Sequence, residues 1–169
     1  MTFRFELLDG THDRSHFTCG EPVLDDWFRV RASQDQRRRV AQVFVALDGS
    51  RIAGFYSLGM ITLALESLPS ELSKKLPRHD AIPAALIGRL ARSKDARGEG
   101  VGDLLLADAI TRVLAAAQSV AAYAIVVDAK DEVGQRFYEA HGFIPLTSKP
   151  RRLFLLTQTA SAALKAALK

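Results

Sequence analysis

Residues 97–102, with the sequence RGEGVG, have side chains and spacing that suit the binding of an anion. An apolar run precedes this segment and a helical apolar stripe follows it, so we expect a loop between a strand and a helix. The first N–H groups of a helix have no partner within the helix, and the helix dipole also favours negative charge there. Glycine lets the backbone approach a pyrophosphate closely, and an arginine adds a charge-assisted contact. We therefore predict a phosphate site made of Arg97, Gly98, Glu99, Gly100, Val101 and Gly102.

The same glycines have a plainer interpretation as a tight turn between a strand and a helix. Two common nucleotide motifs are excluded. The glycines at 98, 100 and 102 alternate, unlike the dinucleotide fingerprint G-x-G-x-x-G, and no Gly-Lys-Ser/Thr follows, as a P-loop would require. Glu99 places an acid inside the loop, which weakens the motif unless its side chain points outward.

Residues 137–143, with the sequence FYEAHGF, contain a second candidate for chemistry, the phenol of Tyr138. A phenol with an ordinary pKa of about 10 is protonated at neutral pH and can donate a proton or a hydrogen bond. The alternative is a core tyrosine that packs beside Phe137. The four histidines and Cys19 have no spacing typical of metal ligands, so we predict no metal site. Cys19 fits a small buried residue better than a nucleophile.

The elements that must position these residues follow from the apolar spacing. In chain order we predict a strand at 3–8, a helix from Pro22, a hairpin of strands 43–47 and 52–58, a short helix at 68–76, a strand at 84–90, a helix after Gly102, a strand at 121–127, a helix at about 131–141 ended by Gly142, a strand at 152–157 and a helical tail at 160–169. In the first helix, Val23, Leu24, Trp27, Phe28 and Ala32 form the buried face. The pattern predicts a mixed α/β layer fold in a single domain, residues 1–169.

Composition and charge narrow the class of protein. The chain has a net charge of +4, from 23 basic and 19 acidic residues, and its arginines and lysines gather in three clusters. Each cluster alone fits a solvated surface, but three in one small domain favour a polyanionic partner such as a nucleic acid or a phosphate-rich cofactor. We find no apolar segment of membrane-spanning length, no export signal and a single cysteine, and we therefore expect a cytoplasmic protein.

The two motifs together resemble the GCN5-related N-acetyltransferase (GNAT) family, in which an R-x-x-G-x-G loop precedes a helix ending in F-Y-x-x-x-G-F. The resemblance covers about residues 40–157. It implies the GNAT fold, a mixed and partly splayed central sheet flanked by helices, and acetyl-CoA as cosubstrate. It also implies that the strand edge at Leu90, Ala91 and Arg92 binds the pantetheine, that residues 97–102 hold the pyrophosphate, and that Asp131 and Phe137 lie in the cofactor site. Tyr138 would be the general acid for the departing thiolate.

A nearer resemblance is to the toxin subgroup that acetylates the amino group of aminoacyl-tRNA and pairs with a ribbon-helix-helix antitoxin. It is carried by FTCG at 17–20, LDDW at 24–27, VFV at 43–45, AGFYSL at 53–58, and IP at 82–83 followed by LIGRLA at 86–91. The resemblance also implies a homodimer. Its tRNA substrate gives the basic clusters a function, and the candidate phosphate contacts are Arg29, Arg38, Arg78, Arg89 and Arg92.

The strand predicted at 84–90 and the following residues to 92 contain no carboxylate that would act as general base. An α-amine, with a pKa of about 7.7–8.0, needs less help than a lysine at about 10.4. Two alternatives stay open: acetylation of a small amine or a protein amino group, and a non-catalytic module that binds coenzyme A or RNA. Gly134 stands where the family pattern leads us to expect alanine.

Overall fold

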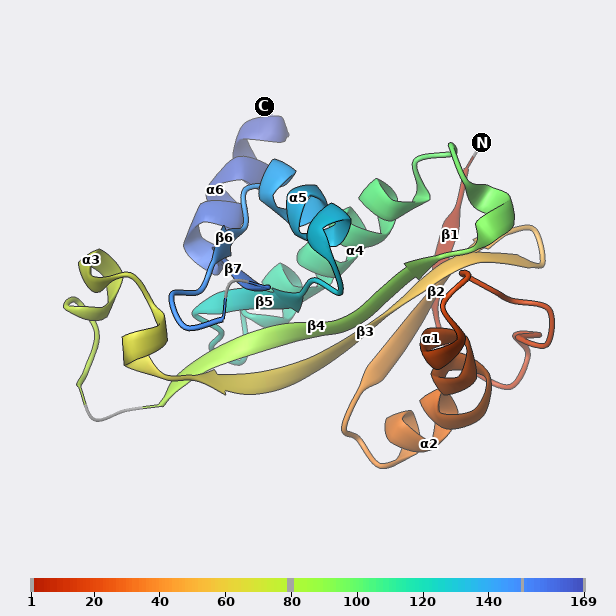
Figure 1. Ribbon diagram of the computed structural model, residues 1–169, viewed down its shortest axis with the longest axis horizontal. Helices are drawn as coiled ribbons and strands as arrows, with labels where there is room; N and C mark the ends of the chain where they lie inside the picture. Colours follow the sequence, from red (N-terminus) through yellow and green to blue (C-terminus); the bar gives the residue numbers. More distant parts are fainter. Residues whose placement is uncertain (1, 79–80, 150, 169) are drawn as a thin grey trace. The chain divides into compact units, whose positions relative to one another are not determined.

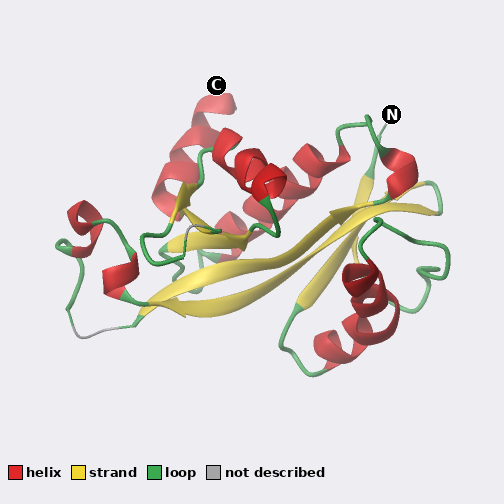
Figure 2. Cartoon of the chain, viewed as in Figure 1, coloured by secondary structure: helices red, strands yellow, loops and turns green. Residues whose placement is uncertain are grey.

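The computed structural model describes residues 2–78, 81–149 and 151–168. Within them, the strands form one sheet in the order β1-β2-β3-β4-β5-β7-β6 (Figure 2). The elements are β1 (Arg4–Leu7), α1 (Pro22–Asp26), the π-helical turn η1 (Trp27–Arg31), α2 (Ala32–Arg37), β2 (Gln42–Asp48), β3 (Arg51–Leu63), the 3-10 turn η2 (Leu65–Ser67), α3 (Ser70–Ser73), β4 (Ile82–Arg92), the 3-10 turn η3 (Lys94–Ala96), α4 (Val101–Ala116), β5 (Ala124–Asp128), α5 (Glu132–Ala140), β6 (Ile144–Pro145), β7 (Arg152–Leu156) and α6 (Thr157–Ala167). This arrangement confirms the predicted mixed α/β class.

The chain forms two compact units. The first contains Met1–Gly59 and Ile87–Thr111, and the second contains Met60–Leu86 and Arg112–Lys169. Each unit has its own buried apolar cluster. The strands β3 and β4 and the helix α4 contribute residues to both units, and the single-domain organisation stays a prediction.

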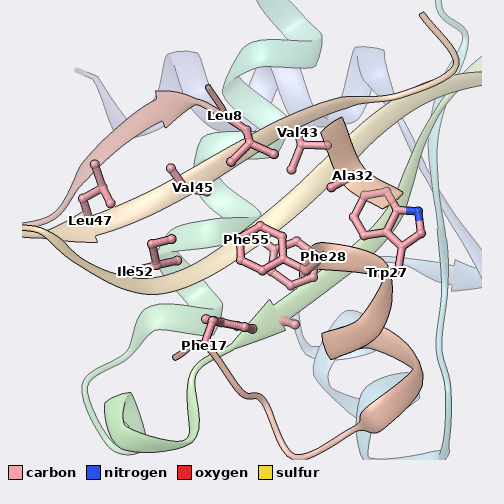
Figure 3. Close-up of a cluster of buried hydrophobic side chains, with 11 residues drawn as sticks. Leu8, Phe17, Trp27, Phe28, Ala32, Val43, Val45, Leu47, Ile52 and Phe55 are labelled. Atoms are coloured by element: carbon pink, nitrogen blue, oxygen red, sulfur yellow. The ribbon is translucent and has the colours of Figure 1, made fainter. Parts of the chain in front are cut away.

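The core of the first unit lies between the β1-β2-β3 strands and the helices α1 and α2 (Figure 1). Three aromatic rings form its centre. Phe28 stacks on Phe55 with ring centroids 4.1 Å apart and ring planes 1° from parallel, and Trp27 stacks on the same ring at 5.9 Å (Figure 3). Stacked aromatic pairs add to the stability gained from burying their area. The aromatic cluster therefore anchors the first helix to the sheet.

The helix predicted from Pro22 is present but is not a continuous α-helix. Between α1 and α2 the turn η1 is π-helical, and the N–H of Ala32 donates to the carbonyl of Trp27. Trp27 and Phe28 are buried as predicted, whereas Val23 is 82% exposed. The prediction for Val23 was wrong because the neighbouring Leu24, not Val23, packs against the cluster in that first turn.

In the second unit, β7 lies between β5 and β6 and pairs antiparallel with both. Its residues Leu153 and Phe154 are buried completely or almost so. The edge strand β6 was not predicted because it has only two residues, one of them Pro145. Figure 1 shows α6 continuing directly from β7. This helix begins at Thr157, earlier than predicted, and the last residue of the predicted tail, Lys169, lies outside the described residues.

The helix predicted at 68–76 is reduced to the four residues of α3. Proline disfavours helical backbone in the residue before it, and Leu68, which precedes Pro69, is accordingly extended (φ −90°, ψ 152°). After α3, Lys75 and Leu76 continue only as turns with bonds to the third residue back. Elsewhere the predicted elements are present with shifted ends. None of the helices in the described residues is long and apolar enough to cross a membrane.

Candidate active site

Of the predicted loop at residues 97–102, residues 97–100 lie between the turn η3 and the helix α4, and Val101 and Gly102 are already the first two residues of α4. Gly98 and Gly100 have positive φ angles of 84° and 73°, in the region that side-chain-bearing residues rarely adopt. The N–H of Leu104 donates to the carbonyl of Gly100 in the first turn of α4. The N–H groups of Val101 and Gly102 come before this residue and therefore have no acceptor inside the helix. The loop therefore has the backbone geometry of an anion site.

Arg97 completes this loop with an exposed cation. Its side chain makes no hydrogen bond or ion pair with the residues that the structure describes. Its backbone is extended (φ −60°, ψ 135°) at the end of η3. The guanidinium of Arg97 is thus available for the predicted contact with a pyrophosphate.

Gly54 on β3 sets how closely the start of α4 approaches the sheet. A Cβ atom at this position would lie 2.7 Å from Cδ1 of Leu105, 2.8 Å from the backbone oxygen of Ala91 and 3.2 Å from Cγ1 of Val101. The clash with Ala91 involves backbone, which cannot rotate away. The absence of a side chain at position 54 therefore allows the first turn of α4 to pack against β3 and β4.

The acid inside the loop is held by an ion pair. The Glu99 carboxylate lies 3.2 Å from Nη2 of Arg51, the first residue of β3. The same guanidinium contacts Asp48 at 2.9 Å and Asp95 at 3.3 Å. Partial burial alone would lower the pKa of Arg51, but its hydrogen bonds to Glu99 and Asp48 raise this pKa overall. The negative charge of Glu99, which would weaken a phosphate site, is therefore paired with a cation that lies far away in the sequence.

The predicted pantetheine edge lies at the end of β4. Ala91 is buried, and the flanking Leu90 and Arg92 are half-buried. The Nε atom of Arg92 is buried and has no hydrogen-bond partner. An unsatisfied buried donor is costly unless a ligand or water accepts from it. This orphan donor marks the end of β4 as a place that fits a polar ligand.

The helix α5 has well-defined ends. Asp131 is its N-cap and accepts a hydrogen bond from the Gly134 N–H at 2.9 Å, so its carboxylate has a structural function. Gly142, with φ of 91°, follows the end of the helix, where Phe143 donates to the Tyr138 carbonyl at 3.1 Å. The predicted helix and its glycine terminator are thus present. The cofactor contact of Asp131 stays a prediction.

Tyr138 lies on α5 and is only 7% exposed. Its ring contacts Phe137 and Phe143, with centroids 5.2 and 5.7 Å away. Burial, and then the negative charge of Asp128, raise the pKa of Tyr138 to about 12. Its hydroxyl makes no hydrogen bond with the described residues. The phenol is therefore fully protonated at neutral pH and keeps its proton available for transfer.

The charge next to Tyr138 is itself fixed. Arg152 donates to both carboxylate oxygens of Asp128, at 2.7 and 2.9 Å, across the β5–β7 ladder. This bidentate geometry holds the carboxylate in one orientation. The hydrogen bonds to Asp128 raise the pKa of Arg152.

Arg89 on β4 lies over the ring of Trp27, with its guanidinium carbon 4.0 Å from the ring centroid. The indole N–H donates to Asp35 at 2.9 Å. Burial lowers the pKa of Arg89, while the charge of Asp35 opposes this shift. The sequence analysis named Arg89 but missed its support by Trp27 and Asp35. The signal available in the sequence was the one tryptophan of the chain, whose place in a helix rich in arginine suggests a ring that an arginine can stack on.

The other candidate tRNA contacts differ in how freely they present their charge. Arg29 donates from Nε and Nη2 to the Phe17 carbonyl, at 3.1 and 2.5 Å, and borders an open hollow of about 470 Å³ formed with residues 10–15. Arg38 and Arg78 are exposed, the first in the first unit and the second in the other. The first unit thus contains Arg29, Arg38, Arg89 and Arg92 together with the loop at 97–102, and the second contains Arg78, Asp131, Phe137 and Tyr138.

The structure corrects one expectation about cysteine. Cys19 is partly exposed instead of buried, and it packs at the edge of the first apolar cluster. Among the described residues, no group of three or more His, Cys, Asp or Glu side chains is arranged to hold a metal ion. His79 lies outside the described residues.

Two kinds of similarity identify the class of this fold and site. The profile of the acetyltransferase (GNAT) domain matches residues 39–145. A curated protein of Mycobacterium tuberculosis, named tRNA-acetylating toxin, is 34% identical over 155 residues, which are 92% of each chain. The chain therefore belongs to the GNAT acetyltransferase family and is an N-acetyltransferase.

Solved structures of the protein AtaT are similar over nearly the whole chain. AtaT complexed with acetyl-methionyl-tRNAfMet has a TM-score of 0.88 at 28% identity and covers 96% of this chain and 99% of its own. AtaTR bound with AcCoA has a TM-score of 0.83 at 27% identity, over 96% and 98%. An AtaT mutant bound to the C-terminus of the antitoxin AtaR, at 24% identity and a TM-score of 0.82 over 97% and 98%, supports the fold alone.

Proposed function

We propose that this chain transfers the acetyl group of acetyl-CoA to the α-amine of an aminoacyl-tRNA and so acts as a toxin that blocks translation. The observation that carries the proposal is the anion-binding loop, in which Gly98 and Gly100 have positive φ at the start of the 16-residue helix α4. Support for the substrate comes from the similarity to a tRNA-acetylating toxin and to AtaT complexed with an acetylated aminoacyl-tRNA.

The residues of the first unit fit acetyl-CoA. The diphosphate binds to the free N–H groups of Val101 and Gly102, with Arg97 supplying a further cation. The buried Nε of Arg92, which lacks an acceptor, suits a polar atom of the cofactor beside Leu90 and Ala91. The family resemblance adds Phe137 and Asp131, which belong to the second unit, as further proposed contacts. When bound, acetyl-CoA supplies the activated acyl group.

Tyr138 is the proposed general acid. The neutral amine forms the new C–N bond with the acyl carbon, the C–S bond breaks, and Tyr138 gives its proton to the departing thiolate. The surplus proton of the amine goes to solvent, and the phenolate regains a proton from solvent. A phenol with a pKa of about 12 holds its proton at neutral pH, so it serves as an acid in this step and not as a base.

An aminoacyl ester needs less help from a general base than a lysine would. The strand β4 carries no carboxylate between Ile82 and Arg92. An α-amine with a pKa of about 7.7–8.0 is already partly neutral at working pH, whereas a lysine at about 10.4 is not. The chemistry of the strand therefore favours the aminoacyl ester over a lysine side chain.

The tRNA contacts, partner and compartment complete the proposal. Arg29, Arg38, Arg78, Arg89 and Arg92 contact phosphates, which position the tRNA without reading its sequence. The chain forms a homodimer and is neutralised by a ribbon-helix-helix antitoxin, and it acts in the cytoplasm, where charged tRNA is found. Sedimentation equilibrium tests the dimer: the expected mass is twice that of the chain, and the mass of one chain contradicts it.

A labelling experiment tests the reaction. Acetyl-CoA with a labelled acetyl group is offered with charged tRNA, uncharged tRNA and a polyamine. We expect label only with charged tRNA, and mild alkaline hydrolysis of the ester should release it as an N-acetyl amino acid. Label on the polyamine alone would show the alternative of a small-amine acetyltransferase. Binding of coenzyme A with no turnover on any acceptor would show a non-catalytic module.

A further inference from the structure

The loop at residues 97–102 contains a carboxylate that competes with its proposed ligand. Glu99 lies two residues before the start of α4 at Val101, where N–H groups lack acceptors and negative charge is favoured. A carboxylate close to a helix N-terminus is attracted to these groups by the helix dipole. The loop thus carries an internal anion that, if free, would occupy the place of a diphosphate or repel it.

The structure holds this carboxylate in an ion pair with Arg51. Oε1 of Glu99 lies 3.2 Å from Nη2 of Arg51, and both side chains are partly exposed, Glu99 by 25% and Arg51 by 31%. Figure 1 shows the β2–β3 turn beside the turn that leads to α4, and the Arg51–Asp95 contact agrees with this placement. The partner of Glu99 therefore comes from a hairpin outside the cofactor loop.

The hairpin turn and two further carboxylates fix the position of Arg51. Gly49, with φ of 62°, forms the turn of the hairpin, and Asp48 pairs with Arg51 both in the ladder and through a 2.9 Å ion pair. On the other side, Asp95 contacts Nη1 and accepts a 2.6 Å hydrogen bond from the Ser93 hydroxyl. Three carboxylates from three segments thus fix the guanidinium in one place.

We propose that Arg51 is a positioning residue of the cofactor site, which keeps the Glu99 carboxylate away from the N–H groups that bind the diphosphate. The inference rests on the proposed function, because it assumes that these groups bind coenzyme A. Arg51 acts on the ligand through Glu99 and not by contact. Without Arg51, the Glu99 carboxylate loses the cation that holds it away from the start of α4, and the affinity for coenzyme A falls.

The decisive test is a double-mutant cycle on coenzyme A binding, measured by titration calorimetry. We expect Arg51→Gln to raise the Kd by about tenfold, or ~1.4 kcal/mol. Glu99→Gln alone should bind at least as tightly as the wild type. The double variant R51Q/E99Q should return to wild-type affinity, because the competing charge is gone. A double variant as weak as R51Q would overturn the proposal.

Two controls separate this mechanism from simpler ones. Arg31→Gln removes an exposed arginine of η1 that makes no ion pair with the described residues, and it should leave the Kd unchanged. Dephospho-coenzyme A keeps the diphosphate but lacks the ribose phosphate. We expect R51Q to weaken its binding by the same factor, and loss of the effect would mean that Arg51 acts on the ribose phosphate instead.

The outcomes distinguish the inference from the proposed function. If the wild-type protein takes up no coenzyme A, the proposed function fails. If the wild type binds and R51Q binds equally well, the function stands and the positioning role of Arg51 is wrong.

Should R51Q not fold, as judged by its thermal transition, Arg51→Lys replaces it. Lysine keeps the charge but cannot bridge three carboxylates, so weaker binding that is restored by adding Glu99→Gln is again the expected result, and unchanged binding overturns the proposal.

Discussion

The guanidinium of Arg89 stacks on the indole ring of Trp27, with its carbon 4.0 Å from the ring centroid. Asp35 holds the indole N–H at 2.9 Å and so fixes the ring. A stacked guanidinium keeps its edge N–H groups for in-plane acceptors such as phosphate oxygens. The side chain of Arg89 makes no hydrogen bond with the described residues. Its orientation is therefore set before any ligand arrives.

Arg89→Gln is expected to weaken the binding of tRNA without changing that of coenzyme A. Loss of one phosphate contact should make the plot of log K against log salt shallower by about 1. Filter binding of charged tRNA at several salt concentrations measures this slope, and Arg4→Gln serves as the control. An unchanged slope would remove Arg89 from the proposed tRNA contacts.

Tyr138→Phe is expected to retain affinity for coenzyme A and lose most turnover. Removal of a general acid lowers kcat by about 10²- to 10⁴-fold. The ring packing on Phe137 and Phe143 is kept, so the thermal transition should change little. Steady-state kinetics with charged tRNA and calorimetry with coenzyme A measure the two effects. Wild-type kcat in this variant would refute the acid role.

The raised pKa of Tyr138 has a consequence for stability at alkaline pH. A folded-state pKa of about 12, above the ordinary value of about 10, means that ionisation disfavours the folded state. The contribution is complete below about pH 10 and is lost as the pH rises towards 12. Denaturant unfolding of the wild type should therefore weaken more steeply over that interval than unfolding of Tyr138→Phe. Parallel pH profiles of the two proteins would contradict this expectation.

Gly100→Ala is expected to destabilise the protein and weaken coenzyme A binding. No atom lies within 4 Å of the added Cβ, so the effect comes from the φ of 73° and not from a clash. Left-handed backbone costs a side-chain-bearing residue about 1–2 kcal/mol. Denaturant unfolding and calorimetry check both parts, and a variant with wild-type values for both would show that the loop tolerates another conformation.

Gly134→Ala makes the same change as Gly100→Ala but is expected to stabilise the protein. The added Cβ would lie 3.4 Å from Oδ1 of Asp131 and 3.7 Å from Cβ of Ala129, which is ordinary contact. Because alanine favours the helix interior over glycine, stability should rise by up to about 1 kcal/mol. The free energy of unfolding measures this gain, and a loss would mean that α5 needs the glycine for another reason.

The parts of the site that could be predicted from the sequence are those set by neighbouring residues. Gly98 and Gly100 before α4, and Gly142 after α5, follow from backbone conformations that few other residues adopt. The partner of Glu99 could not be predicted, since Arg51 lies 48 residues earlier and only the packed hairpin brings it to the loop. Similarly, Trp27 and Arg89 lie far apart in the sequence, and only the packing of the first helix on β4 brings them together.

The irregular turn in the first helix also could not be predicted from the spacing of apolar residues. The π-helical turn η1 shifts the bond of the Ala32 N–H to Trp27, yet five residues are too few for a changed period to be visible. The burial of Val23 was wrongly predicted for a related reason. Periodicity gives the face of a helix, but which side chain of the first turn is covered depends on the segment that packs there.

The position of β7 in the sheet bears on when the protein can complete its fold during synthesis. This strand pairs with β5 on one side and β6 on the other, and it supplies the buried Leu153 and Phe154. A nascent chain that has not yet emerged beyond Leu156 leaves β5 with an unpaired edge and the second apolar cluster unfilled. The second unit is thus assembled only after β7 has been synthesised, so translation products that lack β7 have no complete fold around Tyr138.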